Sequence, residues 1–209
     1  MTAEPALRTK AAPKQARSRA RREALIEYGI ELLNQYDLDE ISIAEVTGKL
    51  GYATGSFYSY FADKEAFFVA VQQRVNDQLD DEFDRMFGNR RLANDPLPAR
   101  LNACLTFAIG YFRRRTGVIR SALRYERRIP EGWAPNRART QAIVQAATQN
   151  LNEADRERLE TALQLAFGLL VNALLHNPGP LRLEDDDLQR KIEDAMGPFL
   201  TAQSQHQGG

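Results

Sequence analysis

The sequence predicts an all-α protein of about nine helices, in which a small three-helix domain precedes a larger helical bundle. Apolar residues recur at spacings of three and four through most of the chain, which is the spacing of one face of a helix. Ser, Asn and Asp residues precede these segments, and Gly or Pro residues follow them, as expected at helix ends. No stretch shows the alternation of apolar and polar residues that is typical of a β-strand.

Composition limits the class of protein. The chain has 209 residues, of which 43% are hydrophobic and 27% are charged, and this balance is typical of a globular protein with a core. Its formal net charge is zero, so nucleic-acid binding cannot be inferred from the total charge. The single cysteine, Cys104, excludes an internal disulfide. No apolar run approaches the roughly 20 residues that span a bilayer, and no signal peptide is recognisable, so we expect a cytoplasmic protein without a membrane partner.

The first element is a basic segment. Residues 1–18 contain two prolines and many Ala, Lys and Arg residues, which favours a flexible arm. The charged side chains between positions 8 and 22 are all basic: Arg8, Lys10, Lys14, Arg17, Arg19, Arg21 and Arg22. Such an arm can contact DNA phosphates or enter a minor groove, although a solvated tail has the same composition. A first helix is expected over about 17–35.

The next element is a short helix over about 43–49. Ser42 followed by Glu45 is the capping-box pattern, in which each side chain satisfies a free backbone amide of the other residue. Ile43, Val46 and Leu50 place one apolar stripe on this helix. Gly51 can adopt the left-handed conformation that ends a helix.

A second short helix is expected over about 53–60, directly after this turn. Two short helices joined by a tight turn form a helix-turn-helix, whose second helix can enter the major groove of DNA. Small residues at its start allow close approach to base edges, and its hydroxyl groups can bind bases or phosphates. The predicted DNA-contacting residues are Arg19, Ser42, Ala53, Thr54, Gly55, Ser56, Tyr58, Ser59, Tyr60 and Lys64. The alternative is a helical hairpin in which the aromatic residues only form core.

This part of the chain resembles the DNA-binding domain of the tetracycline-repressor (TetR) family of transcriptional regulators. The resemblance lies in Ser42, Ile43, Val46, Leu50-Gly51-Tyr52, Gly55-Ser56-Phe57-Tyr58, Tyr60-Phe61 and Lys64-Glu65. It covers roughly residues 19–79. Three positions depart from the family pattern. Ala53 replaces a capping Ser, which weakens the helix start by about 0.5–2 kcal/mol. Tyr60 replaces a His, and Thr47-Gly48 replaces a pair that commonly contains Ala.

The resemblance implies an organisation and a function. Residues 1–18 would form the arm, 19–79 the helix-turn-helix domain with its motif at 42–61, and 80–209 a ligand-binding and dimerisation domain. The protein would be a homodimeric repressor that binds a palindromic operator in double-stranded DNA and is released by a small-molecule effector. In the family, such an effector changes the tilt of the fourth helix.

The remaining helices follow from apolar spacing and breaks. Asp63 is a plausible N-cap for a long helix to Met86. Further helices are expected over Leu97–Arg115, Val118–Arg128 and Trp133–Leu151. The last two, near 155–176 and 185–203, carry more apolar surface than one bundle needs, and we expect them to pair with a second copy.

The middle helices contain the residues of a possible apolar ligand pocket. The predicted lining consists of Leu101, Cys104, Leu105, Phe107, Tyr111, Tyr125, Trp133 and Phe167. An ordinary core would use the same residues.

An enzyme is the competing class of protein. The chain has two histidines and one cysteine, with no metal-ligand spacing and no phosphate-binding Gly-rich loop, so we expect no catalytic residue, metal or cofactor. Cys104 with His176 would require a spatial coincidence that the sequence does not indicate. A helical scaffold or ligand-binding protein without sequence-specific DNA function is the other alternative.

Overall fold

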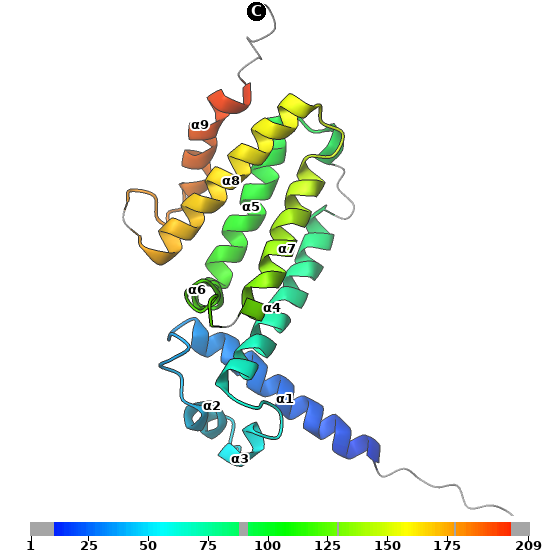
Figure 1. Ribbon diagram of the computed structural model, residues 1–209, viewed down its shortest axis with the longest axis vertical. Helices are drawn as coiled ribbons and strands as arrows, with labels where there is room; N and C mark the ends of the chain where they lie inside the picture. Colours follow the sequence, from blue (N-terminus) through cyan, green and yellow to red (C-terminus); the bar gives the residue numbers. More distant parts are fainter. Residues whose placement is uncertain (1–10, 88–91, 129, 178, 202–209) are drawn as a thin grey trace, which may run out of the picture. The chain divides into compact units, whose positions relative to one another are not determined.

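The computed structural model describes residues 11–87, 92–128, 130–177 and 179–201, without the side chains of residues 11–13 and 130–136. Within these residues there are nine α-helices and one short 3₁₀ helix, and no strand occurs (Figure 1). The all-α prediction is therefore confirmed. The chain divides into two compact units, Met1–Val71 and Gln72–Gly209, so the first unit ends before the domain boundary that we expected at residue 79.

The first unit contains α1 (Ala11–Leu33), α2 (Ile43–Lys49), α3 (Thr54–Phe57) and the first turns of α4 (Lys64–Phe87). Its core includes three aromatic rings, Phe57, Phe61 and Phe67, whose centroids lie 5.1–5.3 Å apart. All three side chains are buried, as are Leu25 and Leu33 of α1. The aromatic cluster therefore ties α3 to the start of α4.

Helices α1 and α4 approach each other closely at Gly29. A Cβ atom at this position would lie 2.5 Å from Cζ of Phe67 and 2.8 Å from Cγ2 of Val71. A side chain at position 29 would push the two helices apart, so glycine is required for this packing.

Two helix lengths differ from the expectation. α1 begins at Ala11, so residues 11–18, which we expected in a flexible arm, are helical. Ala, Lys, Gln and Arg are strong helix formers, and a proline in the first turn costs no backbone hydrogen bond. Residues 1–10, with Arg8 and Lys10, lie outside the described residues. α3 ends at Phe57, because the backbone amides of Tyr60 and Phe61 both turn back to the Phe57 carbonyl.

The second unit is a helical bundle with α5 (Leu97–Arg114) at its centre. α5 packs against α7 (Pro130–Ala147), α8 (Glu153–Leu175) and α9 (Leu188–Thr201), and these helices lie side by side in Figure 1. α6 (Thr116–Arg124) and the 3₁₀ helix η1 (Leu92–Asn94) complete the unit. The expected helices all exist, although α6 and α7 begin two and three residues earlier than their apolar spacing indicated. Both also end four residues earlier than expected, at Arg124 and Ala147.

Polar side chains hold the ends of the bundle helices. Asn152 accepts a hydrogen bond from the backbone amide of Asp155 at 2.9 Å and caps α8. The Arg100 side chain is 2% exposed, and its Nη1 donates to the carbonyl oxygens of Ala147 and Gln149, each at 2.8 Å. A guanidinium group at this position satisfies carbonyls at the C-terminal end of α7 and opposes the helix dipole there.

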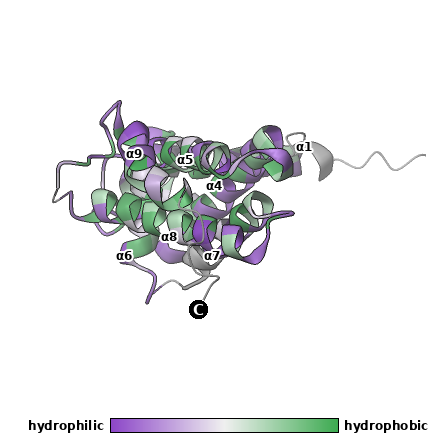
Figure 2. Cartoon of the chain, turned by 90° about the horizontal axis from the view of Figure 1, so that it is seen from above, coloured by the Kyte–Doolittle hydropathy of each residue, from purple (hydrophilic) through white to green (hydrophobic). Residues whose placement is uncertain are grey.

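Helix α8 is apolar around much of its circumference (Figure 2). By length and composition alone, α8 contains an 18-residue stretch, with a mean hydropathy of 1.3, that is apolar enough to cross a membrane, so the expectation that no apolar run approaches this length is wrong for α8. Only 28% of that stretch is buried within one chain. Its charged residues lie in the first turns, and its packing against α5 and α9 covers one side.

Candidate DNA interface and ligand pocket

The α2–α3 segment has the turn geometry expected from its sequence and one of the two hydrogen bonds of the expected capping box. Oγ of Ser42 accepts a hydrogen bond from the backbone amide of Glu45 at 3.0 Å and so caps α2. Gly51 has a φ of +68°, and this left-handed residue turns the chain between α2 and α3. The turn places α3 directly after α2, as in a helix-turn-helix.

Helix α3 and the residues that flank it expose most of their small and hydroxyl-bearing side chains. Thr54, Gly55 and Ser59 are exposed, as are Ala53 and Tyr58, whereas Phe57 is fully buried. A side of the helix that is rich in small and hydroxyl-bearing side chains is therefore available to solvent or DNA. This exposure argues against a hairpin in which the whole segment is core.

The hydroxyl groups of α3 also make local hydrogen bonds. Oγ of Ser56 donates to the Ala53 carbonyl at 2.6 Å, and Oγ of Ser59 donates to the Gly55 carbonyl at 3.5 Å. Each oxygen keeps lone pairs that can accept another hydrogen bond. Ala53 occupies the N-cap position in extended conformation and gives no side-chain cap, so the start of α3 lacks the stabilisation that a Ser would supply.

Lys64 has a structural role that the sequence did not reveal. Its Nζ donates to the carbonyl oxygens of Asp39 at 3.2 Å and Ile41 at 3.1 Å, and so fixes the loop before α2. An ammonium group has three N–H donors, so one remains for a phosphate oxygen. The predicted phosphate contact of Lys64 stays a prediction.

The start of α1 and Tyr60 share a shallow hollow. Arg19, Arg22 and Tyr60 line it, together with Gln15, Ser18 and Glu23. Oγ of Ser18 donates to the Tyr60 hydroxyl at 3.3 Å, which sets the position of the tyrosine tip. The structure therefore brings two predicted DNA-contacting residues, Arg19 and Tyr60, to one place.

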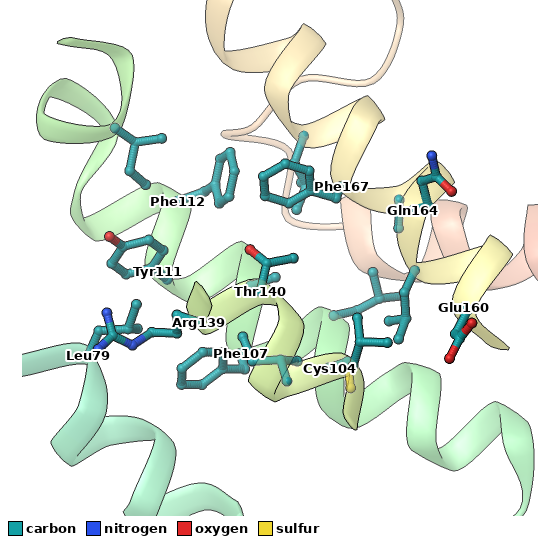
Figure 3. A pocket seen from close by; sticks show the side chains of 18 residues that line it. Leu79, Cys104, Phe107, Tyr111, Phe112, Arg139, Thr140, Glu160, Gln164 and Phe167 are labelled. Atoms are coloured by element: carbon teal, nitrogen blue, oxygen red, sulfur yellow. The ribbon is translucent and has the colours of Figure 1, made fainter. Parts of the chain in front are cut away.

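The second unit contains an apolar cavity of about 330 Å³ between α5, α7 and α8 (Figure 3). Its apolar walls include Phe107, Phe112 and Phe167, with Ile143 and Val144 from α7. Ligand pockets in proteins have volumes of about 300–1,000 Å³ and mostly apolar walls, so the cavity has the size and character of a small-molecule site.

Few polar groups reach this cavity, and two of them are held neutral by burial. Burial raises the pKa of the Cys104 thiol to about 12 and that of the Tyr111 hydroxyl to about 12, although Arg139 and Arg115 oppose the shift at Tyr111. Arg139 lies at the same end as Leu79 and Tyr111, whereas Glu160 and Gln164 lie at the other end (Figure 3).

Comparison with known proteins finds similarity to TetR-family regulators. The family model for bacterial regulatory proteins of the tetR family matches residues 25–71. The crystal structure of a TetR transcriptional regulator from Rhodococcus sp. RHA1 aligns over 90% of this chain and 99% of its own, with 27% identity and a TM-score of 0.54. These matches support the TetR family as the family that this chain resembles, with the family model covering residues 25–71.

Two further TetR-type proteins are similar to the chain. The uncharacterized HTH-type transcriptional regulator YvdT of Bacillus subtilis (strain 168) is 34% identical over 53 residues, so the match spans 25% of this chain and only 27% of that relative. The structure of a TetR-family transcriptional regulator from Streptomyces coelicolor has the same fold, with a TM-score of 0.63 at 21% identity over 85% of this chain and 81% of its own.

The matched segment lies within the first compact unit. It ends at Val71, where that unit ends, and it includes α2, α3 and Lys64. The cavity lies wholly beyond it, in the second unit. The family match therefore bears on the predicted DNA-contacting residues between Ser42 and Lys64, and neither on Arg19 nor on the pocket residues.

The predicted pocket residues are only partly brought together. Cys104, Leu105, Phe107, Tyr111 and Phe167 line the cavity. Leu101 is buried elsewhere on α5, and Tyr125 stacks under Arg128 at the end of α6, with 4.7 Å between guanidinium and ring. The side chain of Trp133 lies outside the described residues.

The sequence prediction missed the contribution of α7 to the pocket. Arg139, Thr140, Ile143 and Val144 all line the cavity. Their spacing of one, three and four residues places them on one face of a helix, and this was the available signal. It was missed because Arg139 and Thr140 are not apolar and the segment therefore lacks a continuous apolar stripe.

Proposed function

We propose that the protein is a DNA-binding transcriptional regulator, and specifically a homodimeric repressor that a small-molecule effector releases from a palindromic operator. The observation that carries the proposal is α3, whose Thr54, Gly55 and Tyr58 are exposed on a helix that a capped α2 and Gly51 hold in place. This is the arrangement that a recognition helix needs to enter a major groove.

The proposed DNA contacts divide by chemistry. Ala53, Thr54, Gly55 and Ser56 at the start of α3 would approach base edges. The hydroxyls of Tyr58, Ser59 and Tyr60 would bind phosphate oxygens, as would Arg19 and Lys64 and the backbone near the Ser42 cap. The helical basic residues at the start of α1 would add phosphate contacts. Such a protein would work in the cytoplasm, where DNA is accessible.

Homodimerisation through α8 and α9 is the second part of the proposal. Leu165 of α8 is 53% exposed and Phe199 of α9 is 41% exposed, and α8 and α9 pack on each other. A two-fold dimer through this surface would present two copies of α3 to an inverted repeat. The exposed apolar side of α8 would then be buried against protein.

The cavity between α5, α7 and α8 would bind the effector. α4 is one continuous helix from Lys64 in the first unit to Phe87 in the second, and Leu79 of this helix lines the cavity. A ligand that shifts the second half of α4 would therefore act on a helix that begins beside α3.

The enzyme alternative receives little support from the geometry. A nucleophilic cysteine requires a lowered pKa, whereas burial raises the pKa of Cys104 to about 12. His176 is exposed at the C-terminal end of α8, and no hydrogen bond joins it to Cys104 in the described part of the chain.

Selection from a random duplex DNA library, with the full-length protein as bait, tests the proposal. We expect enrichment of an inverted repeat whose half-sites lie about one helical turn apart. Tyr60→Phe should then weaken binding to the selected DNA about threefold to tenfold, because one hydrogen bond to a phosphate is lost. Tyr36→Phe is the matched control, since Tyr36 is 43% exposed and lies outside the proposed interface. A library without enrichment would leave a scaffold or ligand-binding protein as the better description.

A further inference from the structure

Among the described residues that line the cavity, Arg139 is the basic one. This side chain is 12% exposed, and its Nε donates to Oδ1 of Asp80 at 2.8 Å, while Nη2 forms an ion pair with Oδ2. The third nitrogen, Nη1, is buried and has no hydrogen-bond partner among the described residues. A buried N–H group without an acceptor is unfavourable, so the guanidinium of Arg139 favours an additional acceptor.

The two members of this ion pair differ in exposure. The Asp80 side chain is 60% exposed, so water can solvate its carboxylate if the pair opens. Arg139 is mostly buried and cannot replace its counter-charge with bulk water in the same way. An incoming anion would therefore replace Asp80 as the counter-charge of Arg139, while water solvates the released Asp80 carboxylate.

The same ion pair ties the pocket to α4. Arg115 Nη2 donates to Oε1 of Gln78 at 2.6 Å, and Arg114 Nη2 donates to Oε2 of Glu82 at 2.5 Å. Positions 78 and 82 share one face of α4, whereas position 80 lies on the opposite face. The end of α5 thus holds one side of α4, and Arg139 of α7 holds the other. Of these three arginines, Arg139 is the one that lines the cavity.

We propose that the cavity binds a small amphipathic monocarboxylic acid, whose carboxylate binds Arg139 and loosens the Arg139–Asp80 pair that holds α4. The inference rests on the proposed ligand-responsive function, and it names the chemical class of the effector. The apolar body of the acid lies between Phe107, Phe112 and Phe167. A guanidinium binds a carboxylate with two parallel hydrogen bonds, which suits the free Nη1 beside a nitrogen released from Asp80.

The remaining lining restricts the charge of the ligand. Glu160 lies at the end of the cavity opposite Arg139 and would repel a second carboxylate (Figure 3). Tyr111, with its pKa raised to about 12, remains neutral and does not compensate the charge of Arg139. One cation at one end of an apolar cavity therefore matches a single negative charge.

Isothermal titration calorimetry with matched pairs of probes tests the inference on the full-length protein. The probes are 3-phenylpropionate against 3-phenylpropionamide, and octanoate against octanamide, since each pair differs in charge and hardly in shape. We expect at least one acid to bind about tenfold or more tightly than its amide, because it gains charge-assisted hydrogen bonds. Equal binding of acid and amide, or no binding of any acid, would overturn the proposal.

Two variants locate the effect. Arg139→Gln should lose the preference for the acid, while Asp80→Asn should keep or increase acid binding because it frees the guanidinium. Glu82→Gln is the matched control, since it removes the corresponding α4 carboxylate outside the cavity and should leave acid binding unchanged. An Arg139→Gln protein that keeps the wild-type preference would overturn the assignment.

The calorimetry requires no DNA, so this test and the test of the proposed function can fail separately. If the inverted repeat is selected but no acid binds, the effector class is wrong and the regulator remains. If acids bind with the expected preference but no DNA is selected, the pocket inference holds as ligand chemistry and the regulatory role fails.

Discussion

Lys64 combines an observed structural role with a proposed DNA contact. Its ammonium group bridges two carbonyls of the loop before α2, although its place in the motif indicates a phosphate contact. We expect a substitution at this position to change the stability of the first unit and, if the proposed contact exists, DNA affinity as well. The two effects must therefore be measured separately.

Lys64→Met should lower the free energy of unfolding by about 1–2 kcal/mol, because two hydrogen bonds from a charged donor to the loop are lost at a half-buried site. Urea titration followed by circular dichroism measures this change. Lys49→Met is the control: it removes the same charge from an exposed position at the end of α2, and the expected change is within about 0.5 kcal/mol. Equal urea midpoints for Lys64→Met and Lys49→Met would show that the contacts of Lys64 with the two carbonyls do not stabilise the protein.

The turn between α2 and α3 is the element on which the interface depends. Gly48 and Gly51 lie three residues apart, and a Cβ atom at either position would meet no atom within 4 Å. Only Gly51 has a positive φ, of +68°, whereas Gly48 is inside α2. The two positions differ in backbone conformation and not in available space.

Alanine at these two glycines should have opposite effects. Gly51→Ala should destabilise the protein by about 1–2 kcal/mol, because an L-residue is strained in the left-handed conformation. Gly48→Ala should stabilise it by up to about 1 kcal/mol, because alanine is the better helix former. Thermal unfolding measures whether each variant is more or less stable than the wild type. Hydrogen exchange of peptides from residues 42–61 shows whether the change in stability lies in this segment. A common sign for both variants would contradict this account of the turn.

The ends of the helices were harder to predict from the sequence than the existence of the helices. α2 matches its expected range because Ser42 and Gly51 mark its two ends chemically. α1 begins earlier than expected because its first residues carry no marked cap, while their helix propensity is high. α3 stops after about one turn because Gly55 and Ser56 are weak helix formers and Ala53 provides no cap.

At the scale of the whole molecule, the exposed apolar side of α8 and α9 predicts a second copy of the chain. Leu165 and Phe199 are large, exposed side chains on helices that pack together. A contiguous exposed apolar surface on a folded chain marks an interaction site. The oligomeric state can be tested without knowledge of operator or effector.

We expect the wild-type chain to have twice its 23.6 kDa mass in solution, and the double variant Leu165→Glu/Phe199→Glu to have the single mass. Four charges at a two-fold apolar interface would each lose hydration, at a cost of several kcal/mol in total. Light scattering coupled to size exclusion at micromolar concentration measures both.

Tyr36→Glu provides the control, since this residue is 43% exposed but belongs to the first unit. It should leave the mass of the wild type unchanged. A wild-type monomer, or a double variant that stays dimeric, would show that this surface is not the interface.

The amino-acid sequence by itself determined the helical class, the cap at Ser42 and the turn at Gly51, because these features depend on neighbours within a few residues along the chain. Membership of the aromatic cluster was also predictable for Phe57 and Phe61, since both recur at helical spacing beside other apolar residues.

The sequence did not predict the ion pair of Arg139 with Asp80 or that of Arg114 with Glu82. The two residues of these pairs are separated by 59 and 32 positions in the sequence. Local propensity contains no information on which charged residues meet across a bundle. Tertiary packing alone decided that a basic side chain borders the apolar cavity, and that the same side chain holds α4.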